Sequence, residues 1–202
     1  MALRPSKSEY SDFYQPYLDV IPEGSSGLIE LMNSSLEACN SLLEDLDSSK
    51  ENYRYADGKW SIKELLLHII DAERVFAYRA LRFARNDSTE LRGFDENSYV
   101  EFSDAGQRSL SDLLKEFNWV RKSNILMFES MDDEALSRMG RVEGNAISVR
   151  ALGFIICGHL LHHLKVLDEK ALANISKPLE APVRNRVGRQ VGVIRSPADC
   201  LF

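Results

Sequence analysis

Four long segments of this sequence carry apolar residues at the spacing of one helical face. They span about residues 25–47, 61–84, 109–131 and 148–173. Within each, apolar side chains recur every three or four positions, which is typical of an amphipathic α-helix. No segment alternates apolar and polar residues over strand length before a hairpin turn, so we expect no sheet. Long amphipathic helices bury their apolar faces most simply against one another, and the pattern predicts an all-α four-helix bundle.

Polar residues mark where two of these helices begin. The sequence SIKE starting at Ser61 is a capping box, in which the Ser61 hydroxyl accepts from first-turn amides and Glu64 reaches back. Ser109 precedes the third segment in the same way. The link between the second and third segments, residues 86–108, is long, and such links are typically functional or cross over the bundle.

The two ends of the chain differ in composition from the middle. The beginning is rich in aromatic residues and proline, and we expect it to form an N-terminal arm packed on the bundle. The end contains proline and glycine, which do not suit a helix. We therefore divide the chain into one domain, residues 1–174, and a short C-terminal tail, residues 175–202.

The overall composition limits the partners that the chain can have. A formal net charge of -6 argues against broad binding to nucleic acid or an anionic membrane, since both require a positive field. No run approaches the ~18 apolar residues of a membrane span, and the beginning lacks the apolar core of a secretory signal. Three cysteines, Cys39, Cys157 and Cys200, are far apart and odd in number, which favours a reducing compartment. We expect a cytoplasmic protein with no nucleic-acid or membrane partner.

The chain has only four histidines, and three of them fall between positions 159 and 163. Successive helical residues turn by about 100°, so His159 and His163 share one face while His162 lies on the flank. His68 lies on the apolar face of the second segment. Because apolar faces meet in the core of a bundle, we predict that His68, His159 and His163 hold one divalent metal ion and leave coordination positions open. Imidazole suits both Zn²⁺ and Ni²⁺, and the sequence does not choose between them.

Other interpretations of these residues stay open at this stage. A single histidine on an apolar face is more often a core residue with a satisfied hydrogen bond, and it is the set of three that favours a metal. We expect His162 beside the ligands or at the surface, with replacement of His163 as ligand a minor alternative. Asp71, one turn after His68, is expected either to orient an imidazole or to face solvent.

Neighbouring residues have simpler interpretations. Glu73 and Arg79 are expected to be ordinary helix-surface charges, with a polar network as the alternative. Trp60 and Cys157 are expected to be packing residues. The sequence contains neither the glycine-rich motifs of nucleotide binding nor the motif of serine-triad hydrolases.

Three stretches of the chain are together similar to one family. YRYADGKWSIKELLLHIIDAERVFAYRALRFAR, GFDENSYV and SVRALGFIICGHLLHHLKVL resemble the DinB/YfiT-like superfamily of candidate metalloenzymes. The likeness covers roughly residues 8–173 and includes a Trp-Ser-x-x-Glu helix start, a His four residues after that Glu, and a final His-x-x-x-His. The resemblance implies a four-helix bundle, often dimeric, with a divalent metal held by three histidines, matched here by His68, His159 and His163.

The resemblance also implies candidate activities. Members of known activity include S-transferases and isomerases that use bacillithiol, mycothiol or glutathione, and many others are known only as candidate metal-dependent hydrolases. Leu160 stands where close relatives often carry an acid, which puts a proton-handling role at that position in doubt. The resemblance, together with apolar residues beyond one stripe such as Phe76, Phe83 and Phe128, predicts a homodimer.

Three functions follow from these expectations, and the sequence alone does not separate them. The first is a metal-dependent S-transferase, in which the ion lowers the pKa of a low-molecular-weight thiol co-substrate. The second is a metal-dependent hydrolase. No acid occupies an obvious general-base position in the last helical segment, which weighs slightly against it. The third is a metal-binding stress-response module without turnover.

Overall fold

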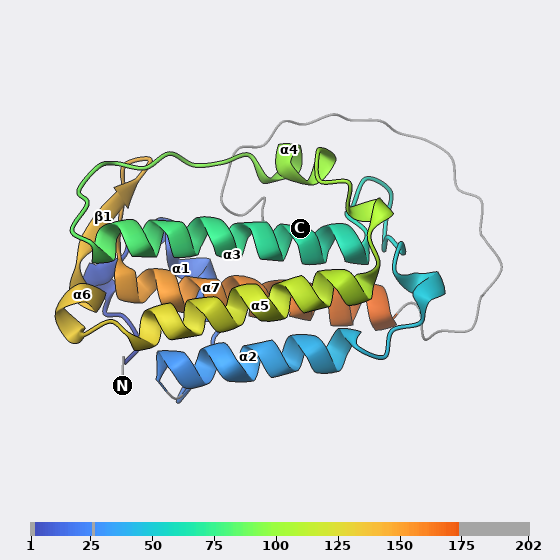
Figure 1. Ribbon diagram of the computed structural model, residues 1–202, viewed down its shortest axis with the longest axis horizontal. Helices are drawn as coiled ribbons and strands as arrows, with labels where there is room; N and C mark the ends of the chain where they lie inside the picture. The colour runs from blue at the N-terminus through green and yellow to red at the C-terminus, as the bar shows by residue number, and fades with distance from the viewer. Residues whose placement is uncertain (1–2, 26, 174–202) are drawn as a thin grey trace.

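The computed structural model describes residues 3–25 and 27–173. In these residues four long α-helices lie side by side along the longest axis of the molecule: α2 (Leu28–Leu43), α3 (Ile62–Ala84), α5 (Leu110–Glu129) and α7 (Val149–Val166) (Figure 1). The predicted four-helix bundle is confirmed. The predicted tail, residues 175–202, lies outside the described residues.

The long link between α3 and α5 makes these two consecutive helices of the bundle parallel. Figure 1 shows α3 and α5 running the same way, and α2 and α7 running the opposite way. Two consecutive helices can be parallel only if the chain returns over their full length, and residues 86–108 do this along the outside of α3. The expectation that the link crosses the bundle is therefore confirmed. Lys63 of α3 anchors its far end, donating from Nζ to the carbonyl oxygens of Gly106 (3.1 Å) and Arg108 (2.9 Å).

Serine caps begin three of the four long helices, as the sequence indicates for Ser61 and Ser109. The backbone amide of Ser61 donates to Glu64 Oε2 (2.7 Å) and the Glu64 amide donates to Ser61 Oγ (3.3 Å), which completes the capping box. The Ser109 and Ser148 hydroxyls accept from amides three residues later. α7 does not continue as a regular α-helix to residue 173, because its last turns, Leu167–Leu172, are π-helical.

Short elements connect and cover the long helices. Three are α-helical: α1 (Gln15–Asp19), α4 (Glu96–Glu101) and α6 (Asp133–Ser137). Four are single 3₁₀ turns: Lys7–Glu9, Asp12–Tyr14, Ser48–Lys50 and Ala105–Gln107. The expected N-terminal arm consists of the first two 3₁₀ turns and α1, and it packs against α7 (Figure 1).

The expectation of no sheet is wrong. Strands β1 (Met139–Val142) and β2 (Asn145–Ser148) form an antiparallel hairpin in which Val142 pairs with Asn145. Its two turn residues, Glu143 and Gly144, have φ values of 47° and 79°, as a tight two-residue hairpin turn requires. The hairpin joins the arm to the link: the Ser11 amide donates to the carbonyl of Ala146 (3.0 Å), and the Leu91 amide donates to that of Arg141 (2.9 Å).

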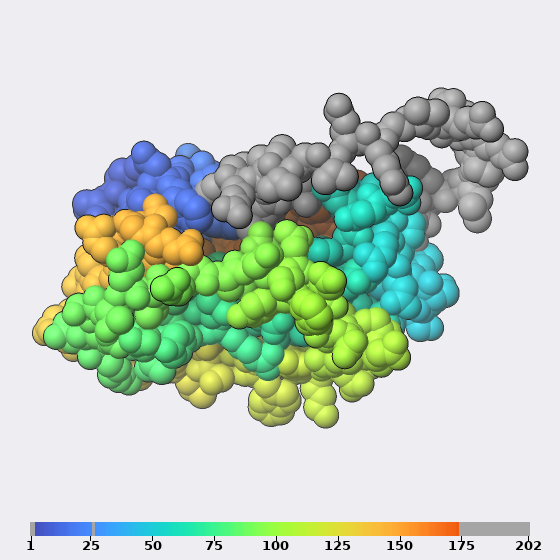
Figure 2. All heavy atoms as spheres, turned by 90° about the horizontal axis from the view of Figure 1, so that it is seen from above, coloured from blue at the N-terminus to red at the C-terminus, as the bar shows by residue number. Residues whose placement is uncertain are grey.

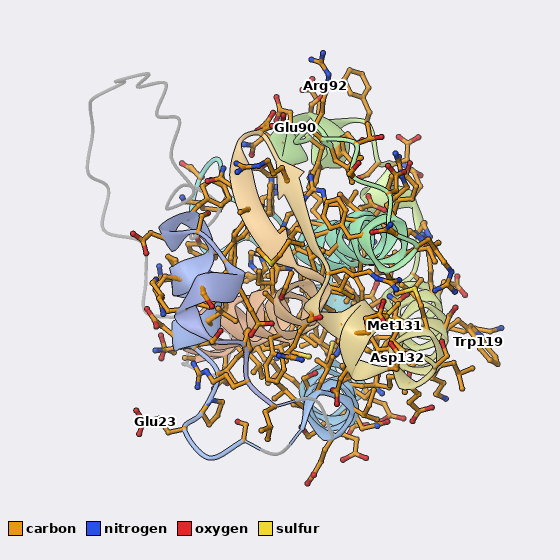
Figure 3. All side chains as sticks on the ribbon, turned by 90° about the vertical axis from the view of Figure 1, so that its left-hand side faces the viewer. Glu23, Glu90, Arg92, Trp119, Met131 and Asp132 are labelled. Atoms are coloured by element: carbon orange, nitrogen blue, oxygen red, sulfur yellow. The ribbon has the colours of Figure 1, made fainter. Side chains whose placement is uncertain are left out.

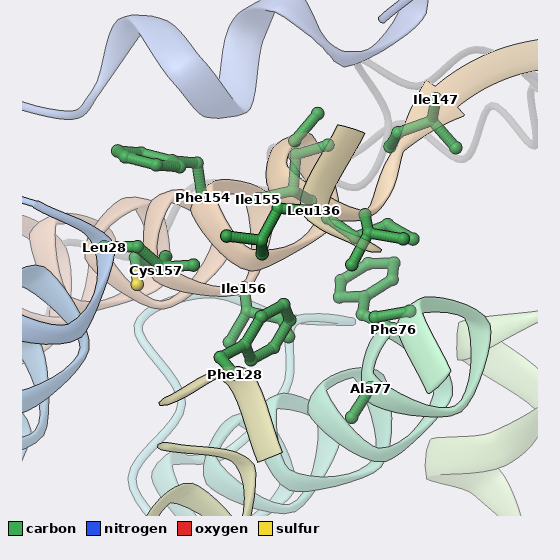
Figure 4. Packing of buried hydrophobic residues seen from close by; sticks show 14 of the residues in the cluster. Leu28, Phe76, Ala77, Phe128, Leu136, Ile147, Phe154, Ile155, Ile156 and Cys157 are labelled. Atoms are coloured by element: carbon green, nitrogen blue, oxygen red, sulfur yellow. The ribbon is translucent and has the colours of Figure 1, made fainter. Parts of the chain in front are cut away.

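Two apolar clusters fill the bundle. One lies toward the hairpin, where Phe76 of α3, Phe128 of α5 and Ile156 of α7 meet (Figure 4). The other lies toward the opposite end and includes Leu66, Phe117 and Leu160. No helix among the described residues is long and apolar enough to cross a membrane.

The core also contains a buried ion pair, so the interpretation of Glu73 as a surface charge is wrong. Arg121 of α5 is fully buried and donates from Nε and Nη2 to the two carboxylate oxygens of Glu73 on α3, at 2.7 and 2.8 Å. Arg121 Nη1 donates to Ser35 Oγ (2.7 Å) and to the Met32 carbonyl (3.1 Å) of α2. One guanidinium therefore ties three helices together at fixed register.

Candidate metal centre

Three imidazoles meet in the middle of the bundle. His68 projects from α3, and His159 and His163 project from successive turns of α7. The Nε2 atom of His159 lies 3.0 Å from Nε2 of His68 and 3.1 Å from Nε2 of His163. One ligating nitrogen from each ring lies within 4.8 Å of both others. The packing of α3 against α7 thus brings together the three histidines that the helical spacing selects.

Burial keeps these imidazoles neutral. Each of the three side chains is almost completely buried. Burial lowers the pKa of His68 to about 4. It also lowers the pKa values of His159 and His163 well below 6.5, and the neighbouring histidines lower them further. At neutral pH all three therefore present nitrogen lone pairs, which is the form that binds metal.

Aromatic rings enclose the cluster. The Trp60 ring lies 4.6 Å from the His68 ring between centroids. The rings of Tyr17 and Phe76 lie 5.7 and 5.6 Å from that of His159. Trp60 is therefore a packing residue, as expected, and it packs against the candidate ligand His68. These rings pack against the imidazoles and limit their movement.

His162 and Asp71 lie outside the convergent set. His162 is partly buried, with its ring 5.1 Å from that of His163, and the three converging nitrogens include His163 rather than His162. Asp71 is partly buried beside Arg74 of its own helix, with an oxygen–nitrogen distance of 3.6 Å. Burial raises the pKa of Asp71, while Arg74 opposes the rise. No hydrogen bond among the described residues joins Asp71 to an imidazole, so the expectation that it orients one gains no support.

Two cavities reach the histidine cluster from different sides. The first, of about 180 Å³, touches His162 and His163 and is bordered by residues 53–62 and the end of α7. The second, of about 120 Å³, touches His68 and His159 and is bordered by the arm, the link and the hairpin. Figure 2 shows the blue arm, the orange hairpin and the green link gathered on one face of the molecule. Glu96 of α4 lines both cavities.

The three nitrogens are spaced so that they could hold one divalent metal ion. Bonds of about 2.0–2.1 Å at tetrahedral angles place two ligand nitrogens about 3.3 Å apart. The two separations of 3.0 and 3.1 Å are close to that value, so a small outward movement of the rings would accommodate an ion. Three protein ligands leave at least one position open, which is the pattern of a reactive site rather than a closed structural one.

Two features near the cluster differ from the expectations or were missed. Arg79, interpreted from the sequence as a surface charge, is only 5% exposed and lines the second cavity. Its position on the apolar face of α3, together with His68, Ala72 and Phe76, was the sequence signal for this burial.

Leu160 is fully buried in an apolar cluster. This position has a packing role, and no acid is available here to handle a proton.

Comparisons with known proteins agree with this architecture. The sequence pattern of the DinB superfamily matches residues 33–167. Among solved structures, YfiT from Bacillus subtilis, described as a probable metal-dependent hydrolase with an unusual four-helix bundle topology, is similar with a TM-score of 0.64 at 17% sequence identity. The likeness covers 86% of this chain and 94% of YfiT, and at that identity it concerns the fold. No curated protein matches the chain. With the family pattern spanning most of the bundle, this chain belongs to the DinB superfamily.

Proposed function

We propose that this protein is a divalent-metal-dependent S-transferase that uses a low-molecular-weight thiol as co-substrate. The observation that carries the proposal is the convergence of three buried, neutral imidazoles at a point reached by two cavities. His68, His159 and His163 would hold the ion, and Zn²⁺ and Ni²⁺ are the leading candidates because imidazole suits both. When bound, such an ion supplies Lewis acidity that lowers the pKa of a coordinated thiol.

The charge of the site supports this chemistry. All three converging ligands are neutral, so they leave the charge of a divalent ion uncompensated. The rings of Trp60, Tyr17 and Phe76 keep the surroundings apolar, which strengthens electrostatic attraction to a thiolate. A thiolate sulfur is also a favourable ligand for either metal.

The two cavities favour a reaction with two substrates. A thiol in one cavity and an electrophile in the other would both reach the histidine cluster. Neither cysteine of the described residues suits the role of the thiol, because Cys39 and Cys157 are fully buried and burial raises their pKa values to about 12 and about 11. In the transfer, a sulfur–carbon bond forms, the bond from that carbon to its leaving group breaks, and the thiol proton passes to solvent.

A metal-dependent hydrolase is the second candidate. The similarity to YfiT favours it, as does Glu96, whose carboxylate side chain lines both cavities. In that case Glu96 would accept the proton of the attacking water. Glu96→Gln would then abolish hydrolysis, whereas a thiol transfer in which the ion activates the sulfur would lose much less activity.

The test is a panel of thiols with a chromogenic electrophile. Metal-loaded protein is mixed with 1-chloro-2,4-dinitrobenzene and glutathione, cysteine, bacillithiol or mycothiol, and His159→Ala serves as the control. Conjugation that needs the metal and strongly prefers one thiol would support the transferase. Ester or amide hydrolysis that needs metal without thiol would favour the hydrolase, and no turnover in either assay would leave a metal-binding module without catalysis.

We also propose that the protein forms a homodimer through the outer face of α5. The aromatic residues that suggested a dimer from the sequence, Phe76, Phe83 and Phe128, are buried within one chain and give no support. Trp119 and Leu126 support a dimer, because they are 66% and 68% exposed and lie two turns apart on α5. In Figure 3 Trp119 projects away from the bundle. Large exposed apolar side chains on one helix face are typical of a protein–protein contact.

A further inference from the structure

A buried guanidinium lines the second cavity together with two histidines of the cluster. Arg79 is 5% exposed and shares the cavity lining with His68, His159, Phe76 and Phe94. Phe76 lies between His68 and Arg79 along α3, and its ring centroid is 5.6 Å from that of His159 and 5.7 Å from the Arg79 guanidinium carbon. The cavity lining thus combines histidines, an aromatic ring and a cation, in that order along α3.

The Arg79 charge is not neutralised by a neighbouring acid. No ion pair of the described residues, at up to 4.0 Å, includes Arg79, and its Nη2 donates a hydrogen bond to the carbonyl of Arg92 (3.1 Å). Burial lowers the pKa of Arg79, and the nearby Tyr14 and Glu143 oppose this shift only in part. A guanidinium has five N–H donors in a fixed fork, so most of its capacity remains for a ligand.

Two acids border the same cavity without forming an ion pair with Arg79. Glu143 is exposed at the hairpin turn, and its carboxylate packs beside Gly93 of the link. Glu96 is partly exposed on α4. Glu143 acts on Arg79 from more than 4.0 Å away, so it partly offsets the charge and leaves the guanidinium donors available. A buried charge that is only partly compensated is costly to a fold, and a ligand that completes the site would remove this cost.

We propose that the second cavity binds an elongated substrate with a carboxylate at one end, and that Arg79 holds this carboxylate. The opposite end of this substrate would carry the electrophilic carbon and lie at the histidine cluster. This part of the proposal rests on the proposed function. A carboxylate matches the guanidinium fork with two parallel hydrogen bonds. The rings of Phe76 and Phe94, 5.7 and 5.9 Å from the guanidinium carbon, provide stacking surface for an unsaturated or aromatic body.

The helix sets the length of such a substrate. His68 and Arg79 are eleven residues apart on α3, which corresponds to about 16 Å between their Cα atoms. The long arginine side chain leans toward the start of the helix and shortens the gap between the charged group and the imidazoles. A substrate would therefore carry its carboxylate about the length of a phenyl ring or more from its reacting carbon.

A purely structural role for Arg79 makes a different prediction. Its hydrogen bond to Arg92 could serve only to fasten the link onto α3. Loss of the side chain would then lower stability without changing which ligands bind. A comparison of a charged ligand with a neutral ligand of the same shape separates the two roles.

The probes are 3-phenylpropionate and its neutral isostere 3-phenylpropionamide, titrated into the full-length protein by isothermal calorimetry. Wild-type protein should bind the acid at least about tenfold more tightly than the amide, since a hydrogen-bonded charge pair contributes about 1.5–3 kcal/mol. Arg79→Gln should lose this preference while its affinity for the amide stays the same. Arg74→Gln, on the same helix but outside the cavity, should keep the preference, and circular dichroism of each variant checks folding.

Equal binding of the acid and the amide to wild-type protein would overturn the proposal, as would a preference retained by Arg79→Gln. Binding of neither probe at millimolar concentration would also overturn it. The wild-type comparison needs no variant, so it stands even if Arg79→Gln fails to fold. Because no turnover is required, a preserved preference for the acid with no thiol conjugation would reject the transferase and retain the carboxylate site.

Discussion

The buried pair of Arg121 and Glu73 is the clearest single-residue test of how the bundle is held in register. Removing one partner leaves a buried charge without compensation, whereas removing both does not. We expect Arg121→Met to lower the free energy of unfolding by about 3–5 kcal/mol. The double variant Arg121→Met with Glu73→Leu should be more stable than the sum of the single changes by at least ~1 kcal/mol. Urea unfolding of the four proteins measures this coupling.

Simple additivity of the two substitutions would contradict this account of the pair. Asn124 offers an internal control, because its Nδ2 donates to Glu73 Oε1 at 3.1 Å without carrying charge. Asn124→Leu removes a neutral hydrogen bond, and its cost should be nearer 1 kcal/mol. A cost as large as that of Arg121→Met would show that packing rather than charge dominates at this position.

The buried cysteines predict slow thiol chemistry in the native protein. Cys39 and Cys157 have raised pKa values, about 12 and about 11, because burial disfavours their thiolates. In a Cys200→Ser variant the folded protein should react with Ellman's reagent only as fast as it opens, and two thiols should titrate in denaturant. The unfolded thiols ionise near pH 9 and the native ones do so higher, so the folded state loses stability as pH rises from about 9. Fast reaction of either thiol at pH 8 in the native state would be incompatible with their burial.

Single residues also show where sequence reasoning succeeds and where it stops. His68, His159 and His163 could be selected because helical spacing fixes which side chains share a face, and facing stripes meet in a bundle. Arg79 and Arg121 were missed as buried charges because periodicity records apolar residues and assigns charge to solvent. The burial of Arg121 depends on Glu73 of another helix, which local spacing does not encode. Arg79 shares the apolar face of α3, so its burial could have been inferred from spacing.

At the scale of elements, α7 and the arm approach too closely for any side chain at Gly158. A Cβ atom at this position would overlap the carbonyl oxygen of Tyr17, which is backbone and cannot move alone. In an open helix, Gly→Ala stabilises by up to about 1 kcal/mol, so the sign of the change is diagnostic. We expect Gly158→Ala to destabilise the protein by about 1–3 kcal/mol in urea unfolding.

Gly106→Ala is the matched control, because open space surrounds that position and its backbone needs no left-handed conformation. It should leave stability within about 0.5 kcal/mol of the original. A neutral or stabilising Gly158→Ala would mean that the arm does not rest on α7 as described. The Tyr17 ring lies beside His159, so loss of this contact should also expose the histidine cluster to solvent.

The elements themselves were predictable to different degrees. The four long helices follow from apolar periodicity, and the Ser61 and Ser109 caps fixed two of their starts. The hairpin was missed because each strand has four residues and the turn places Glu143, rather than asparagine or glycine, at positive φ. Backbone hydrogen bonds to Leu91 and Ser11, which are far away in the sequence, stabilise the hairpin where local strand propensity is weak.

At the scale of the whole molecule, the proposed dimer depends on an exposed apolar face. Light scattering at micromolar concentration should give twice the chain mass, and the double variant Trp119→Ser with Leu126→Ser should give the monomer mass. Phe102→Ser removes another highly exposed aromatic residue, outside α5, and should leave the dimer intact. A monomer mass for the unchanged protein would reject the dimer, and a dimer that survives the double variant would place the interface elsewhere.

The central claim is that three imidazoles from two helices hold one divalent metal ion, and elemental analysis of the purified protein tests it most directly. After loading with Zn²⁺ or Ni²⁺ and removal of excess metal, we predict about one ion per chain for the unchanged protein. His68→Ala and His163→Ala should each lose most of the metal while helical content persists, and His162→Ala should retain it. No stoichiometric metal in the unchanged protein, or a full complement in His163→Ala with loss in His162→Ala, would contradict the claim.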